Sequence, residues 1–163
     1  MSLPFRAVLP LALSAAIMAA SHEVYAAGDN PPSGYCALFT TEQIAAALGK
    51  PVKAGRVPEM VTDACQWDAV TGKGEVTVMA TLAGIWNDAI GHSGLRPVTG
   101  IGQKAYVGIA PQGGKQAGAV APCGTKCPAL TIDNAFYVVT VNPAPSDDTV
   151  VGLLREFIKR SSR

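Results

Sequence analysis

The sequence predicts an α+β fold, in which an antiparallel or mixed sheet of about five or six strands carries helices on one face. Two stretches, near the two ends of the expected domain, have the apolar spacing and the end signals of helices. Between them, short alternating runs are joined by turn-forming residues, which is typical of β-hairpins. Four cysteines predict that disulfides staple the fold.

The first 26 residues have the layout of a secretory signal peptide. Arg6 supplies a positive charge, and residues 7–20 form an apolar run that is too short to span a bilayer comfortably. Val24 and Ala26 fit positions −3 and −1 of a cleavage site. The length of the run disfavours the alternative, an N-terminal membrane anchor. We therefore expect a periplasmic or secreted protein with no stable membrane anchor after signal cleavage.

The remaining chain has the length of one domain. Residues 27–35 are rich in breakers and predict a flexible leader, which precedes a single α+β domain over 36–163. Cleavage would remove one basic and one acidic residue, so the net charge of +1 would not change. No basic stripe is present in the sequence, which argues against nucleic acid as a partner.

The first predicted helix begins at Thr40 and ends at Gly49. Thr40 and Gln43 fit a capping box, and Phe39 and Ile44 fit the hydrophobic staple around it. Gly49 is the expected stop. The next predicted elements are, in chain order, a candidate strand over 52–57, a hairpin of 65–70 and 75–82, a short helix over 84–91, a strand over 105–110, a long loop over 111–128, and a hairpin of 129–133 and 136–141.

Within the first hairpin, Cys65, Trp67 and Ala69 share one face by the two-residue period, while Gln66 and Asp68 point the other way. The last predicted helix is capped by Ser146, has acidic residues in its first turn and basic residues in its last turn. Its apolar stripe predicts a core-packing face formed by Val150, Leu153, Leu154, Phe157 and Ile158.

The cysteines are Cys36, Cys65, Cys123 and Cys127. An even number in an exported chain favours disulfides over free thiols. Four cysteines allow three pairings, among which sequence alone does not choose. We favour Cys36–Cys65 and Cys123–Cys127, because each pair then joins neighbouring elements. In the chain-entropy model the longer loop contributes on the order of 3–4 kcal/mol and the shorter about 2 kcal/mol.

Three segments, residues 36–51, Cys65-Gln66-Trp67 and residues 98–106, together resemble the exported domain-of-unknown-function 3558 group of secreted or lipid-anchored proteins. The resemblance implies an exported α+β domain with a helix-to-sheet disulfide, and it brings no catalytic residue. The chain departs from the group by lacking a lipid-anchoring cysteine and by adding the second cysteine pair.

Cys123 and Cys127 are the first candidates for chemistry. A redox-active pair normally has two intervening residues and lies at a helix N-terminus, which lowers the pKa of one thiol. Here three residues intervene, prolines flank the pair, and no βαβ pattern surrounds it. A loop staple is therefore favoured over redox chemistry, and too few further ligands are present to predict a metal site.

Other candidates are interpreted mainly as structural. Residues 100–105 match the Gly-x-Gly-x-x-Ala dinucleotide pattern, but a strand rather than a helix is expected to follow. His92 lies in a predicted loop beside Ser93, with no orienting carboxylate placed by the sequence. Asp63, Asp68 and Glu75, around the first hairpin, could pair as acid and base but are expected to be solvated. Trp86 could be an exposed binding aromatic but is expected to lie in the core.

These patterns predict an exported, soluble, non-catalytic binding or interaction module, whose contact surface is the sheet face or the 111–128 loop. Its ligand is an unknown protein or small molecule, and no catalytic, cofactor-binding or metal-ligating residue is assigned. The alternatives are a thiol–disulfide redox protein that uses Cys123 and Cys127, and a small periplasmic inhibitor or immunity-type protein.

Overall fold

The computed structural model describes residues 34–85, 94–124, 127–128, 133–144 and 146–163. These residues belong to one compact unit, Pro31–Arg163. The predicted signal peptide and residues 27–33 of the predicted leader lie outside the described residues. Within the described part, no helix combines the length and the apolar composition that crossing a bilayer requires.

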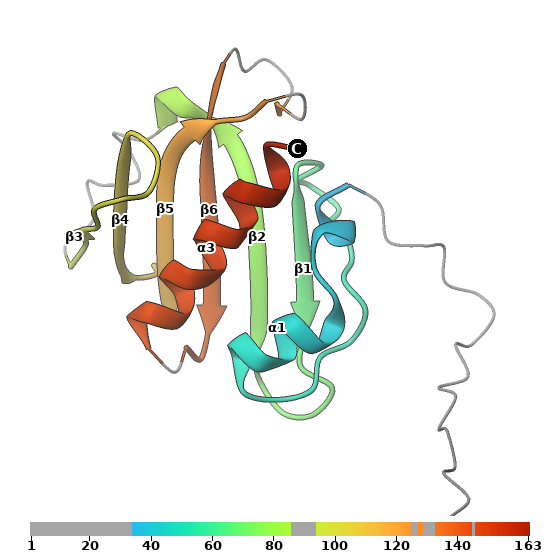
Figure 1. The fold of residues 1–163 in the computed structure, drawn as a ribbon. Helices are drawn as coiled ribbons and strands as arrows, with labels where there is room; N and C mark the ends of the chain where they lie inside the picture. Colours follow the sequence, from blue (N-terminus) through green and yellow to red (C-terminus); the bar gives the residue numbers. More distant parts are fainter. Residues whose placement is uncertain (1–33, 86–93, 125–126, 129–132, 145) are drawn as a thin grey trace, which may run out of the picture. The chain divides into compact units, whose positions relative to one another are not determined.

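A six-stranded, fully antiparallel sheet forms the centre of the described unit, in the order β1-β2-β6-β5-β4-β3. A β1–β2 hairpin and a β3–β6 meander join where β2 pairs with β6. The two main helices lie on one face of this sheet (Figure 1), which confirms the predicted fold class. The strands are β1 (Ala64–Asp68), β2 (Glu75–Leu82), β3 (Arg96–Pro97), β4 (Lys104–Ile109), β5 (Lys115–Pro122) and β6 (Asn134–Asn142).

The first helix, α1 (Thr41–Leu48), follows the 3₁₀ turn η1 (Gly34–Leu38). The hydroxyl oxygen of Thr40 accepts a hydrogen bond from the backbone N–H of Gln43, and the Gln43 side chain accepts one from the Thr40 N–H. Gly49 ends the helix with a φ of 78°, a conformation that glycine adopts without a steric penalty. The predicted capping box and stop are confirmed.

The last helix, α3 (Asp147–Ser161), crosses the sheet over β5 and β6 (Figure 1). The Ser146 side chain accepts a hydrogen bond from the Thr149 N–H, which confirms the predicted cap. Phe157 packs edge-on against Tyr35 and Tyr137, with ring centroids 5.2 and 5.3 Å apart. The predicted stripe is therefore a core-packing face, with Ile158 partly buried at its border.

Both favoured disulfides form. Cys36–Cys65 joins η1 to β1, and Cys123–Cys127 closes a short loop directly after β5. Cys65, Trp67 and Ala69 are buried on the helix-covered face of the sheet, as the two-residue period predicts. The Cys36–Cys65 disulfide therefore links the turn before α1 to β1, an edge strand of the sheet.

The prediction of a long loop over 111–128 is wrong, because this segment contains β5. The strand lies inside the sheet between β4 and β6. Ala117, Ala119 and Ala121 are buried beneath α3. Alanine and glycine have low strand propensity, so the alternation in this segment is easy to overlook.

Other boundaries also differ from the predictions. Residues 52–57 do not form a strand but make two isolated bridges, from Arg56 to Gln66 in β1 and from Val52 to Ala69 directly after it. The short helix predicted over 84–91 is described only for its start, where η2 (Ala83–Ile85) is a 3₁₀ turn. In the second predicted hairpin, residues 129–132 lie outside the described residues, and β6 pairs with β2 and β5.

Candidate functional site

The second disulfide lies at the end of an internal strand, where β5 stops at Pro122. Cys123 is fully buried in the main core, and Cys127 is half-buried beside it. Cys123 directly follows a strand, and no helix begins at it within the described part of the chain, whereas a redox thiol is normally activated by a helix N-terminus. The packing supports the predicted staple.

Residues 100–105, which match the dinucleotide pattern, form a turn that leads into a strand, as the sequence predicts. β4 follows directly, so no helix N-terminus is available to meet a pyrophosphate here. Gly102 has a φ of 53°, and a Cβ added there would lie 2.2 Å from the carbonyl oxygen of Val120. The glycine is therefore required by the close approach of the turn before β4 to the backbone of β5.

Of the three hairpin carboxylates predicted as a possible acid–base set, the structure brings two together. Asp68 and Glu75 are paired across β1 and β2, and the side-chain amide of Gln66 donates to both, at 2.9 and 3.2 Å. Arg56 Nε donates to the other oxygen of Asp68 at 3.3 Å. Asp63 precedes β1 and takes no part in this network.

This arrangement reduces repulsion rather than creating a reactive pair. Like charges directly opposite each other in a sheet are destabilising; here the Gln66 amide bridges the two carboxylates, and the Arg56 guanidinium pairs with Asp68. The side chain of Asp68 is 36% exposed, so water also solvates it. The network fits the expectation that charges on the outer face of this hairpin are solvated.

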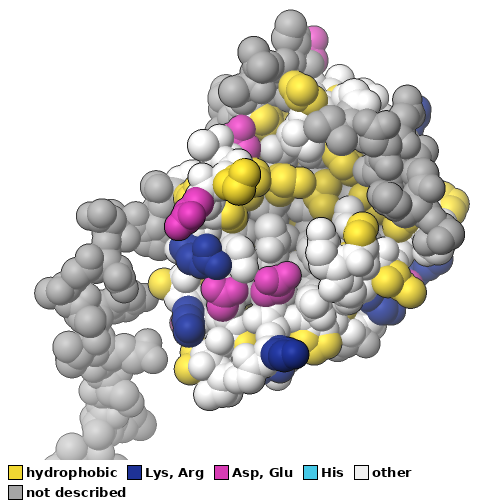
Figure 2. All heavy atoms as spheres, turned by 180° about the vertical axis from the view of Figure 1, so that it is seen from behind, with side chains coloured by type: hydrophobic (Ala, Val, Ile, Leu, Met, Phe, Trp, Pro, Cys, Tyr) yellow, Lys and Arg dark blue, Asp and Glu magenta, His cyan; other side chains and the backbone are white. Residues whose placement is uncertain are grey.

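These residues belong to the sheet face opposite the helices, which we call the rear face. Its polar part, on β1, β2 and β6, is half-exposed and consists of Gln66, Asp68, Glu75, Thr77 and Thr140. Figure 2 shows acidic and basic side chains beside one another on this face, with a band of hydrophobic side chains above them.

The apolar part of the rear face is a second hydrophobic cluster, separate from the core under the helices. The cluster consists of four residues that are 2–7% exposed: Tyr106, Val120, Phe136 and Val138. Three partly buried side chains pack against it, Met79, Ala83 and Leu95. Tyr106 lies opposite Gly118, and a Cβ there would come within 2.8 Å of its ring. The Tyr106 hydroxyl accepts a hydrogen bond of 2.7 Å from Gln116.

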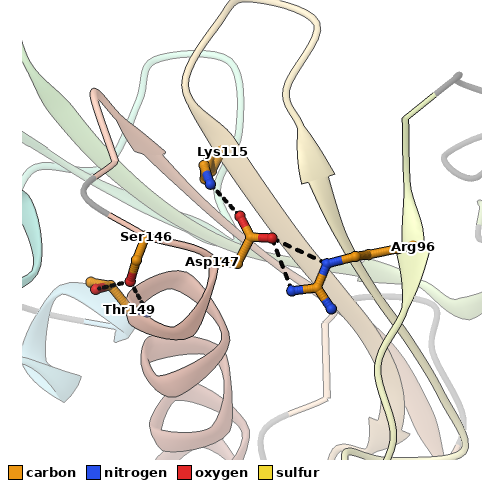
Figure 3. A network of polar contacts seen from close by, with 5 residues as sticks. All are labelled: Arg96, Lys115, Ser146, Asp147 and Thr149. Carbon is orange, nitrogen blue, oxygen red and sulfur yellow. Dashed lines mark hydrogen bonds and ion pairs between the residues drawn. The ribbon is translucent and has the colours of Figure 1, made fainter.

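A three-residue ion-pair network at the start of α3 was not predicted. Arg96 on β3 donates to Asp147 Oδ2 through Nε and Nη2, at 3.1 and 2.9 Å, and Lys115 on β5 donates to Oδ1 (Figure 3). The hydrogen bonds from Lys115 and then Arg96 hold the pKa of Asp147 below its ordinary value of 3.8. The network anchors the first turn of α3 to the sheet.

The sequence gives no local signal for that network, because its members are 51 and 32 residues apart. The sequence predicts only that Asp147 lies in the first helical turn, where the helix dipole favours a negative charge. His92, Ser93 and Trp86 lie outside the described residues. In the described part of the chain, no group of three or more histidine, cysteine or acidic side chains is placed to hold a metal ion.

Comparison of the chain with protein-family models, with curated proteins and with solved structures finds no match in any of the three.

Proposed function

We propose that the protein is an exported, non-catalytic binding module, and that the polar part of the rear face is its contact surface. The observation that carries this proposal is a sheet face which neither α1 nor α3 covers and which presents half-exposed polar side chains. Thr77 and Thr140 are direct cross-strand partners near the middle of that surface.

Export is part of the same proposal. Its support is the signal-peptide pattern of the first 26 residues, together with two disulfides in a small domain. Membership of the domain-of-unknown-function 3558 group is likewise proposed. Its support is the capped helix that begins after Thr40 and the Cys36–Cys65 bridge to the sheet.

The proposed contact surface does not include residues 111–128, the segment that the sequence predicts as a long loop and as an alternative contact surface. Because β5 occupies the middle of 111–128 and buries its alanines, this segment cannot adapt to a partner without opening the sheet. The polar part of the rear face keeps its backbone hydrogen bonds in place while its side chains remain accessible. A rigid surface of this kind binds with a low ordering cost.

The test places a large charge in the middle of the proposed surface. Thr77→Arg and Thr140→Arg are compared with Ala46→Arg, which changes an exposed position on α1. We expect both threonine variants to weaken capture of a stoichiometric partner from periplasmic or secreted extract at least about tenfold, with unchanged melting temperatures. Capture that survives both variants would contradict the proposal.

Two measurements on the wild-type protein distinguish the kinds of ligand. A small inhibitor or immunity-type protein would co-purify with one enzyme at a fixed ratio, whereas a small-molecule binder would show a ligand-dependent rise in melting temperature. In either case Ala46→Arg should behave like the wild type. Nucleic acid is not proposed as a partner.

A thiol–disulfide role for Cys123 and Cys127 remains the second candidate, because half-buried Cys127 is the sulfur that an attacking thiolate could reach. Against it stand the burial of Cys123 and its place after a strand. A reduction potential in the range of structural disulfides, with no insulin reduction, would exclude this role. Insulin reduction that Cys127→Ser abolishes would establish it.

A further inference from the structure

We propose that Met60 is an oxidation site, at which a peroxide converts the thioether to a sulfoxide while the fold stays intact. Met60 is 96% exposed. The other methionine outside the predicted signal peptide, Met79, is half-buried against the second hydrophobic cluster. The two side chains therefore present the same chemistry in opposite surroundings.

The turn that carries Met60 is held by backbone hydrogen bonds at both ends. Before it, Arg56 and Gln66 exchange two bonds of 2.9 Å, and after it the Ala80 N–H donates to the Asp63 carbonyl at 3.0 Å. None of these bonds involves the Met60 side chain. Because the Met60 side chain is exposed, an oxygen added to its sulfur enters solvent and displaces no packed group.

The reaction balances without any group from the protein. With hydrogen peroxide, the sulfur donates an electron pair to one oxygen, and the O–O bond breaks as the S–O bond forms. The transferred oxygen loses its proton, and the second oxygen takes up a proton and leaves as water. Sulfur is oxidised and the peroxide is reduced. No general acid from the chain is needed, because water at the exposed sulfur can supply and accept the proton.

Oxidation would change the character of this turn. Val57 and Val61 are 43% and 37% exposed, so the loop presents three apolar side chains to solvent. A sulfoxide replaces a flexible apolar group by a polar one. The modification therefore alters a surface property while leaving the core untouched, and it is independent of binding at the rear face.

The test treats the folded, disulfide-bonded protein with hydrogen peroxide and follows each methionine by peptide mass mapping. We expect Met60 to oxidise at least about tenfold faster than Met79, with no change in melting temperature when Met60 alone is modified. In denaturant the two rates should converge. Met60→Leu should remove the fast phase and leave the rate at Met79 unchanged.

Equal rates in the folded protein would overturn the proposal, because they would mean that the fold does not expose Met60 selectively. A fall in melting temperature that accompanies oxidation of Met60 alone would also overturn it. The Met60→Leu protein controls for the second outcome, since any loss of stability caused by peroxide in that variant must come from elsewhere.

Discussion

The guanidinium of Arg160 lies over the ring of Phe39, 4.8 Å from its centroid. The same side chain donates to the Leu38 carbonyl and, at 2.8 Å, to the side-chain oxygen of Gln43. Gln43 is also the N3 residue of the capping box at the start of α1. One arginine near the end of α3 therefore fixes the start of α1, which lies more than a hundred residues earlier in the chain.

We predict that Arg160→Met lowers the free energy of unfolding by about 1–2 kcal/mol, because it removes the hydrogen bonds to Leu38 and Gln43 and the cation–π contact, as well as the pair with Glu156 on the same helix. Lys159→Met is the matched control, since Lys159 is exposed and its ion pair among the described residues is with Glu156 on the same helix. That variant should change stability by less than about 0.5 kcal/mol. Chemical denaturation measures both; equal losses would show that charge at the helix end, rather than contact, matters.

Gly55 is required by the packing of the first disulfide against Trp67. A Cβ added at Gly55 would lie 2.5 Å from the indole nitrogen of Trp67 and 2.8 Å from the sulfur of Cys65. We predict that Gly55→Ala lowers the free energy of unfolding by about 1–3 kcal/mol, because a buried ring cannot move away without strain.

Gly152 offers the opposite case on α3. A Cβ added there meets nothing within 4 Å. Gly152→Ala should therefore raise the free energy of unfolding by about 0.5–1 kcal/mol through helix propensity alone. Thermal denaturation of the two variants should move in opposite directions. A stabilised Gly55→Ala protein would contradict the position of Trp67 in the core.

Much of the fold was predictable because its signals are local. The capping box at Thr40 and the stop at Gly49 depend on a few neighbouring residues, and so does the alternation that buries Cys65 and Trp67. Sequence spacing also favoured the observed disulfide pairs. Each of these predictions needed little knowledge of how distant segments meet.

Strand β5 and the candidate surface were harder to predict, for a physical reason. Ala117 and Ala119 are small because α3 crosses the sheet above them, and that crossing is a tertiary fact. β3 is two residues long and contains Pro97, so it has no usable periodicity. The rear face emerges only when β6 inserts between β2 and β5.

The ion pairs of Asp147 predict a pH dependence. Its pKa in the folded protein is below 3.8, its ordinary value, so the stabilisation is present above that pH and is lost as pH falls through the folded pKa. Asp147→Asn should cost about 1 kcal/mol at neutral pH. The difference from the wild type should disappear in strong acid.

Asp148→Asn is the matched control, because it removes the same charge from the same helical turn at an exposed position. It should cost less at neutral pH than Asp147→Asn. Urea denaturation at a series of pH values measures both variants. If the two variants had the same effect at every pH, the helix dipole rather than Arg96 and Lys115 would account for the role of Asp147.

The buried hydroxyl of Tyr137 affects the free energy of unfolding at neutral and at alkaline pH. Its hydroxyl is buried and has no hydrogen-bond partner among the described residues, and burial raises its pKa to about 12. Tyr137→Phe should therefore raise the free energy of unfolding by about 1 kcal/mol at neutral pH, because it removes an unsatisfied buried group. Tyr106→Phe should have the opposite sign, since it removes the hydrogen bond from Gln116.

The pH dependence of Tyr137 follows from the same burial. Its pKa in the folded protein lies above the ordinary value of 10.0, so the unfolded chain ionises first as pH rises. The free energy of unfolding of the wild type is therefore unaffected by this group below pH 10 and falls as pH rises from 10 toward about 12. The advantage of Tyr137→Phe over the wild type should consequently grow across that window. Tyrosinate absorbance during an alkaline titration measures the ionisation directly. Ionisation of Tyr137 near its ordinary pKa in the folded protein would show that water reaches the hydroxyl and would remove the basis of this prediction.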